Sequence, residues 1–63
     1  MFTLRQWRRA KEITVAEMAK ALDIHPNTYI KWEENPGMVT MKNAHKIAEI
    51  LEVRIEAIDF LCS

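Results

Sequence analysis

The chain has 63 residues, 49% of them apolar and 29% charged, and its formal net charge is zero. A chain this short forms one small domain that hides roughly 60% of its unfolded surface, which leaves little volume for a deep catalytic cleft. One cysteine and two histidines exclude an internal disulfide framework and a structural zinc site, so we expect no metal and no cofactor. No apolar run approaches the roughly 20 residues of a membrane span, and no charged-then-apolar leader is present, so we expect a cytoplasmic protein without a membrane partner.

Two threonines mark the start of the first two predicted helices. Thr3 can cap a helix over residues 4–12. Residues 14–17 read Thr-Val-Ala-Glu, which fits a capping box: the threonine hydroxyl accepts from an unpaired amide, and the glutamate reaches back to the cap. The second helix is therefore expected to run from this box to about Leu22.

A proline and a further threonine mark the next two helices. His25-Pro26 opens the third helix, because proline at the first helical position sacrifices no hydrogen bond, and this helix should end at about Glu33 or Glu34. Residues 35–37 read Asn-Pro-Gly, the strongest turn signal in the chain. Thr40 then caps a fourth helix, whose buried stripe consists of Ala44, Ile47, Ala48 and Leu51.

The last segment is predicted to form a fifth helix over residues 54–61, with Ile55, Ile58 and Leu61 pointing inward. No segment alternates apolar and polar residues over a length sufficient for a strand. Together these elements predict a compact all-α protein with a single domain over residues 1–63.

The most informative segment spans residues 14–33, which contain a helix, a short turn at about residues 23–25 and a second helix. Ala19 lies in the middle of the first of these helices, where a small side chain lets the second helix cross closely. This is the helix-turn-helix arrangement, in which the second helix can enter the major groove of DNA.

Nearly the whole chain resembles a known family at positions that are individually unspecific but together have the family spacing. These positions are Arg8, Glu17-Met18-Ala19, Tyr29, Trp32-Glu33, Ile47-Ala48 and Leu51-Glu52-Val53. At these residues the chain resembles the phage repressor and Cro-like (XRE-type) helix-turn-helix family. The resemblance implies a five-helix lambda-repressor-like domain, with the helix-turn-helix at helices 2 and 3.

The chain departs from the family pattern where helices end. Glycines common in the family are replaced here by Glu12, Asp23 and Glu52. Either these helices end differently, or the fold accepts left-handed residues at a cost of order 1 kcal/mol per site. Val15 stands where the family often has glutamine, which removes one polar contact to the phosphate backbone.

Candidate base-contacting residues lie on the third helix. Asn27, Thr28 and Lys31 share its outer face, because Lys31 lies four and three residues beyond the other two. An asparagine amide matches adenine N6 and N7, a lysine can donate to guanine, and Pro26 and Thr28 offer apolar contact to thymine methyls. The alternative is an ordinary solvated face. Ile30 is either such a contact or packing at the flank of the helix.

Candidate phosphate contacts follow from the charge distribution. Residues 1–31 hold six basic against three acidic side chains and residues 32–63 the reverse, so the net charges are +3 and −3. Helix N-termini bind anions, and family precedent favours Thr14 and Lys42. His25 is interpreted as a helix cap or a phosphate contact. For the remaining cations, an ordinary surface charge is equally compatible; these are Arg5, Arg9 and Lys20.

Two further roles are implied by the resemblance. Arg8 and Glu33 pair between the first and third helices in the family, which would leave Arg8 also near a phosphate; two unrelated surface charges are the alternative. Val53, Arg54 and Ile55, with the fifth helix, would form a dimer interface, for which core packing is the alternative.

These observations predict a bacterial or phage sequence-specific regulator of transcription, a repressor with no enzymatic step. It would bind double-stranded operator DNA as a homodimer, with no small-molecule effector. The alternative from a different class is a protein-binding adaptor or antitoxin module that uses the same fold through its acidic half, at Glu49, Glu52, Glu56 and Asp59.

Overall fold

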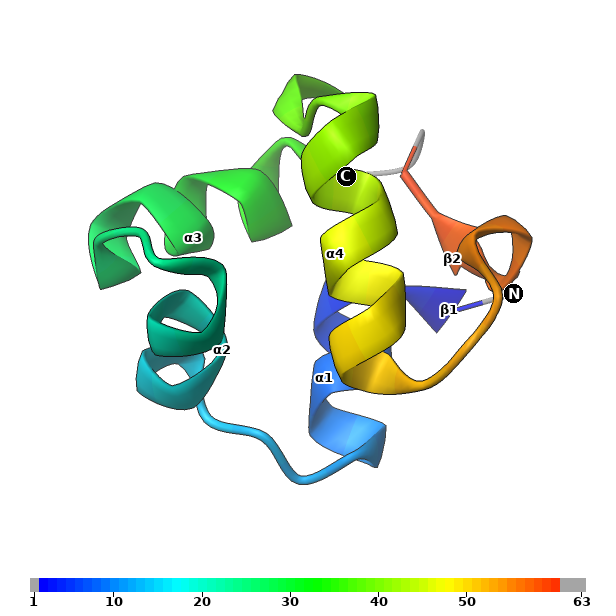
Figure 1. Cartoon of the computed structure of the whole chain (residues 1–63), viewed down its shortest axis with the longest axis horizontal. Helices are drawn as coiled ribbons and strands as arrows, with labels where there is room; N and C mark the ends of the chain where they lie inside the picture. Colours follow the sequence, from blue (N-terminus) through cyan, green and yellow to red (C-terminus); the bar gives the residue numbers. More distant parts are fainter. Residues whose placement is uncertain (1, 61–63) are drawn as a thin grey trace.

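The computed structural model of the chain describes residues 2–60 (Figure 1). Its α-helices are α1 (Leu4–Ala10), α2 (Val15–Leu22), α3 (Pro26–Glu34) and α4 (Met41–Leu51). Two 3-10 helices, η1 (Pro36–Met38) and η2 (Ile55–Ala57), and two strands, β1 (Phe2–Thr3) and β2 (Ile58–Asp59), complete the described fold. The four α-helices occupy the predicted segments, although α1 ends two residues earlier than the predicted residue 12.

Threonine side chains start three of the helices, as the sequence predicts. The Thr14 amide donates to Glu17 Oε1 at 2.9 Å, and the Glu17 amide donates to Thr14 Oγ1 at 3.1 Å, which completes the capping box. Thr3 makes the equivalent box with Gln6 at the start of α1. Thr40 accepts a hydrogen bond from the Asn43 amide at the start of α4. Each cap satisfies an amide that the first helical turn leaves unpaired.

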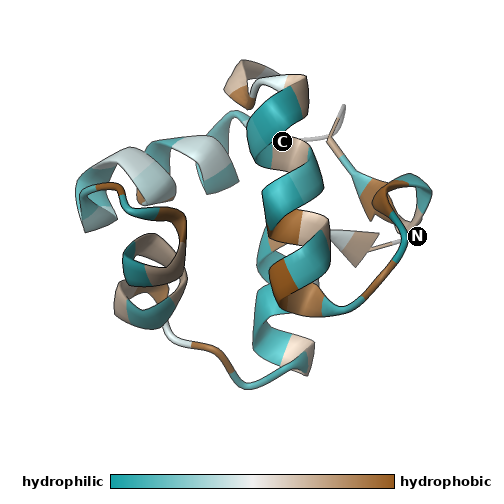
Figure 2. Ribbon diagram, viewed as in Figure 1, coloured by the Kyte–Doolittle hydropathy of each residue, from teal (hydrophilic) through white to brown (hydrophobic). Residues whose placement is uncertain are grey.

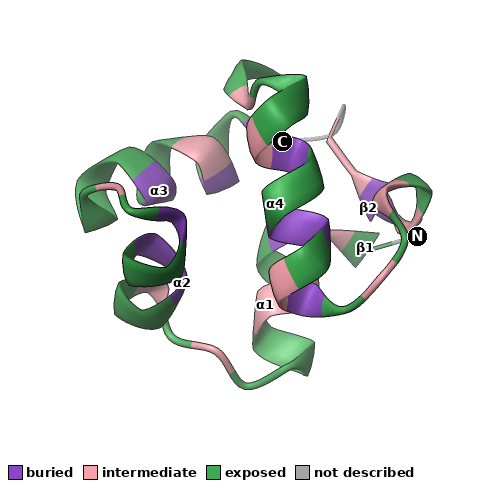
Figure 3. Cartoon of the chain, viewed as in Figure 1, coloured by how far each residue is buried: buried purple, intermediate pink, exposed green. Residues whose placement is uncertain are grey.

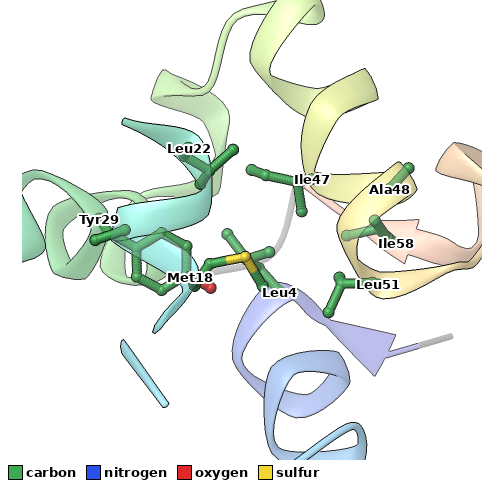
Figure 4. Packing of buried hydrophobic residues seen from close by; sticks show 9 residues of the cluster. Leu4, Met18, Leu22, Tyr29, Ile47, Ala48, Leu51 and Ile58 are labelled. Carbon is green, nitrogen blue, oxygen red and sulfur yellow. The ribbon is translucent and has the colours of Figure 1, made fainter. Parts of the chain in front are cut away.

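The hydrophobic core lies where α1, α2, α3, α4 and β2 meet (Figure 4). Fully burying a large apolar side chain stabilises the fold by roughly 1.5–3 kcal/mol, so these residues fix the arrangement of the helices. The large side chains that are fully buried are Leu4, Met18, Tyr29, Ile47 and Leu51.

The predicted fifth helix over residues 54–61 does not form within the described residues. The segment contains η2 and β2 instead, and β2 pairs in parallel with β1, with Phe2 opposite Ile58. The prediction that the chain has no strand is therefore also wrong, because a two-residue strand is too short to show alternation. Leu61, predicted to point inward from this helix, lies outside the described residues.

A side chain of α1 bonds the backbone of this segment in its observed 3-10 conformation. The indole N–H of Trp7 donates to the carbonyl oxygen of Ala57 at 2.8 Å. In an α-helix that carbonyl would instead accept from the amide four residues later. The Ala57 amide donates to the Arg54 carbonyl, three residues back, which is the 3-10 pattern. Trp7 is half-buried, and this hydrogen bond holds the segment against α1.

Within residues 2–60, three residues other than glycine adopt the left-handed conformation. They are Glu12, Asp23 and Glu52, with φ angles of 57°, 58° and 58°. Each position is one where the related family commonly has glycine, so the fold accepts positive φ rather than ending these helices differently. An L-residue costs roughly 1–2 kcal/mol in this conformation, and Asp tolerates it better than most.

The arrangement of the elements leaves most of α3 exposed to solvent. In Figure 1, α2 and α3 lie on one side of α4, and the β1–β2 pair lies on the other. Figure 2 shows apolar stretches along α2 and α4, whereas α3 is largely hydrophilic. The core therefore takes only a narrow stripe of α3, and its outer face remains open to a partner.

Candidate nucleic-acid interface

The outer face of α3 carries the side chains predicted to contact bases. Pro26, Asn27, Thr28 and Lys31 are all exposed. In Figure 3 much of α3 is coloured as exposed. On the opposite face Tyr29 is fully buried, which prevents α3 from turning about its axis. All four predicted residues are therefore exposed to solvent. Helical spacing places Asn27, Thr28 and Lys31 on one face, which we call the α3 strip, whereas Pro26 lies at the N-terminal end of α3 on a different side of its axis.

The rotation of α3 is also fixed by a buried carboxylate near its end. The Arg8 guanidinium on α1 donates to both carboxylate oxygens of Glu33, through Nε and Nη2, and Arg8 Nη1 donates to the Ile13 carbonyl at 2.9 Å. Arg5 adds a further ion pair to Glu33 at 3.3 Å. Only 3% of the Glu33 side chain and 11% of the Arg8 side chain are exposed. This cluster connects α1 to the back of the reading helix through bonds of defined direction.

The charge states of this cluster follow from burial and pairing. Burial by itself raises the pKa of Glu33. The hydrogen bonds and positive charge of Arg8 lower it by a larger amount, so the pKa lies below its usual value. The hydrogen bonds to Glu33 raise the pKa of Arg8. Burial, and then the nearby Glu33 carboxylate, raise the pKa of Tyr29 far above its usual value. The phenol oxygen of Tyr29 is buried and has no hydrogen-bond partner among the described residues. At neutral pH the cluster is therefore an ionised pair beside a neutral phenol.

His25 caps the N-terminus of α3. Its Nδ1 accepts from the Asn27 amide at 3.1 Å, and its ring is exposed. An accepting Nδ1 carries no proton, so in the neutral ring the proton is on Nε2, which is free to donate. The Thr28 amide already donates to the His25 carbonyl. His25 is therefore observed as a helix cap, and its Nε2 atom is the group it can offer to a phosphate.

The N-termini of α2 and α4 differ as anion sites. Thr14 is exposed at the start of α2, but the Glu17 carboxylate shares that terminus, and its hydrogen bonds with Thr14 lower the pKa of Glu17, which keeps it ionised. The first turn of α4 has no acidic residue and carries the exposed Lys42. Because a helix N-terminus attracts anions and a carboxylate repels them, α4 offers the better phosphate site.

The segment predicted to form a dimer interface lies next to an apolar cavity. Val53 and Ile55 are half-buried against the core, whereas Arg54 is exposed. Ile55 also lines a cavity of about 440 Å³ between the start of α4 and η2. Met41, at the edge of this cavity, is 71% exposed. The remaining lining residues are Val39, Ala44, His45, Glu56 and Phe60.

Sequence reasoning missed two features of this site. Arg5 contacts Glu33 together with Arg8; the two arginines lie three residues apart and so share one face of α1, which was a usable signal. Glu34 is exposed at the end of the α3 strip, three residues beyond Lys31. Helical spacing places Glu34 on this strip. It was not predicted as a site residue because the expected DNA contacts were cations and uncharged side chains.

In residues 2–60 no three His, Cys, Asp or Glu side chains gather where they could hold a metal ion. None of the helices in this range has the length and apolar character needed to cross a bilayer.

Comparison with known proteins relates this geometry to one family. A family model described as helix-turn-helix matches residues 4–58. Among curated proteins, the chain is 41% identical over 59 residues to the cryptic phage CTXphi transcriptional repressor RstR of Vibrio cholerae serotype O1. The match covers 94% of this chain and 50% of the relative, so the chain spans about half the length of that protein. No solved structure matches the chain.

Proposed function

The chain belongs to the helix-turn-helix family, and from that premise we propose that residues 1–63 act as a sequence-specific DNA-binding domain that regulates transcription without an enzymatic step. In this proposal α3 enters the major groove of double-stranded DNA, which is wide enough to admit an α-helix.

The α3 strip is the observation that carries this proposal. Asn27 can bind the N6 and N7 edge of adenine, and Lys31 can donate to O6 or N7 of guanine. Thr28 offers a hydroxyl and a methyl group, and Pro26 an apolar edge. Because Tyr29 and Glu33 hold the opposite face of α3, the strip presents these groups in one fixed direction.

Contacts with the DNA backbone would set the position of α3 in the groove. We assign the strongest phosphate contact to the N-terminus of α4 and Lys42, with Thr14 and His25 Nε2 as further donors. Arg8 would contribute through the small part of its guanidinium that remains exposed. Such contacts determine register and orientation but carry no sequence information.

The proposed mechanism is repression by occupancy of an operator. A curated relative is a phage transcriptional repressor, and a domain of this size reads only a few base pairs. Two copies on half-sites about one helical turn apart multiply specificity. We assign the dimer contact to Val53, Arg54 and Ile55 together with the cavity that Ile55 lines.

Selection of duplexes from a random library tests the DNA-binding proposal. The expected result is enrichment of a two-fold symmetric motif, with affinity that falls with salt at a log–log slope of about −0.9 per neutralised phosphate. Lys46→Ala serves as a control, because it removes one exposed lysine of α4 outside the proposed contacts. No enrichment and no salt dependence would overturn the proposal and favour the adaptor or antitoxin alternative, in which the acidic half binds a protein.

The dimer assignment is tested separately with Met41→Gln. Met41 is largely exposed, so the variant should fold normally while placing a polar amide at the apolar cavity, and it adds no charge to the N-terminus of α4 that is proposed to bind phosphate. The expected result, by sedimentation velocity with labelled DNA, is that wild type places two copies on a symmetric duplex and the variant one. Two copies of the variant bound with unchanged cooperativity would contradict this assignment.

A further inference from the structure

Ile30 is a large apolar side chain on α3 that is partly exposed to solvent. It is 40% exposed and does not belong to the buried cluster or to the half-buried residues packed against that cluster. The other large apolar side chains that are exposed in residues 2–60 are Phe2, Met38 and Met41, none of which is on α3. The exposed part of Ile30 is therefore an apolar surface on α3 that a partner can contact, which favours readout over packing alone.

Helical spacing places Ile30 next to the α3 strip. It lies three residues after Asn27, so the two side chains are neighbours on the helix surface. Successive residues advance by 100° around the axis, which places Ile30 and Thr28 on opposite flanks of the line through Asn27 and Lys31. With the opposite face of α3 fixed by Tyr29, Ile30 cannot turn into the core.

This position matches one chemical feature of the major groove. Among the base edges displayed there, the C5-methyl of thymine is the apolar group, and apolar side chains recognise it by contact. A β-branched side chain on a helix is confined mainly to one rotamer, so Ile30 presents its methyl groups with little loss of conformational freedom. A helix rigidly docked in the groove would bring Ile30 against the base pair beside the one that Asn27 contacts.

We propose that Ile30 is a specificity-determining residue that selects thymine by contact with its C5-methyl group. This inference rests on the proposed function and deepens it, because it predicts that each half-site contains a thymine whose methyl group, rather than its hydrogen-bonding edge, is recognised.

Replacement of single thymines by deoxyuridine tests this directly, because the change deletes only the methyl group. The duplex is the motif selected from the random library. Wild-type protein should lose about fourfold in affinity at one thymine per half-site, the factor expected for one apolar carbon removed from a contact. Ile30→Ala should bind the thymine duplex more weakly and show no further loss with deoxyuridine. Ile30→Val, which keeps a branched side chain, should retain part of the preference.

The outcomes separate this inference from the function on which it rests. If wild type prefers its motif yet tolerates deoxyuridine at every position, Ile30 does not read thymine, although the DNA-binding proposal stands. The same conclusion holds if Ile30→Ala loses as much affinity as wild type at the same thymine, since another side chain then contacts that methyl. If the protein selects no motif, both proposals fail. Ile30 is exposed, so equal melting temperatures of Ile30→Ala and wild type should confirm that the comparison concerns folded protein.

Discussion

The α1–α3 side of the molecule and the α4–η2–β2 side are held together by different interactions. On the first side, Arg5 and Arg8 bond the buried Glu33 in fixed directions behind an exposed polar strip. On the second, apolar packing and a sheet of two short strands leave an open cavity lined mostly by apolar side chains. Charged hydrogen bonds fix the rotation of a helix, whereas apolar contact is non-directional. The first arrangement suits a surface that must present particular groups, and the second suits a surface that accommodates a partner.

The largest expected effect on stability comes from removing one partner of the ion pair on the α1–α3 side. Arg8→Ala leaves the buried Glu33 carboxylate with Arg5 alone, whose side chain is 47% exposed. Removing one partner of a buried pair costs roughly 3–5 kcal/mol, which is a large part of the stability of a domain this small. Urea unfolding followed by circular dichroism measures the change. Arg9→Ala, an exposed arginine of the same helix, is the matched control and should unfold like wild type. An Arg8→Ala midpoint equal to that of wild type would show that the ion pair is not structural.

Low pH should reduce the stability of the protein by protonating Glu33 on the same side. Its pKa in the folded state is lowered from the usual value of 4.5, so the folded state favours the ionised form. The stabilisation is therefore complete above about pH 4.5 and is lost as the pH falls through the folded-state pKa. The difference in unfolding free energy between wild type and Glu33→Gln should be constant near neutral pH and shrink below pH 4.5. A difference that stays constant into strong acid would contradict the assigned charge state.

Substitutions in the α3 strip should change DNA recognition but not the stability of the fold. Asn27→Ala and Lys31→Ala should each relax base preference by about 1–3 kcal/mol at one position of the selected motif. Lys42→Ala should instead weaken all sequences alike and reduce the salt slope by about one. Competition between the motif and scrambled duplexes at several salt concentrations distinguishes the two classes. Equal losses on both duplexes for all three variants would overturn this division of roles.

The smallest expected effect concerns the left-handed residues that end helices on both sides of the molecule. Asp23 ends α2 before the reading helix, and Glu52 ends α4 before η2, both in the left-handed conformation. Glycine relieves a cost of roughly 1–2 kcal/mol there but adds chain entropy to the unfolded state. Glu52→Gly should therefore stabilise the protein by about 1 kcal/mol, and Asp23→Gly by less, because aspartate tolerates positive φ. Thermal melting of the two variants measures this order, and destabilisation by Glu52→Gly would show that its side chain makes a compensating contact.

The sequence by itself determined the four α-helices and the α3 strip. Threonine caps, Pro26 and the apolar spacing act over three or four residues, and so does the rule that places Asn27 and Lys31 on one face. Interactions of such short range can be read from neighbouring residues. The Arg8–Glu33 pair links two different helices, and it was expected only because the chain resembles a known family.

Only the tertiary structure decided the conformation of residues 54–60. Residues 54–60 have an apolar pattern typical of a helix. The indole N–H of Trp7, fifty residues earlier, nevertheless donates to the Ala57 carbonyl oxygen, and β2 pairs with β1. The sequence likewise left open whether Glu12, Asp23 and Glu52 would accept positive φ. These outcomes depend on hydrogen bonds and packing between segments that are distant in the sequence. Such contacts form only when the whole chain is folded.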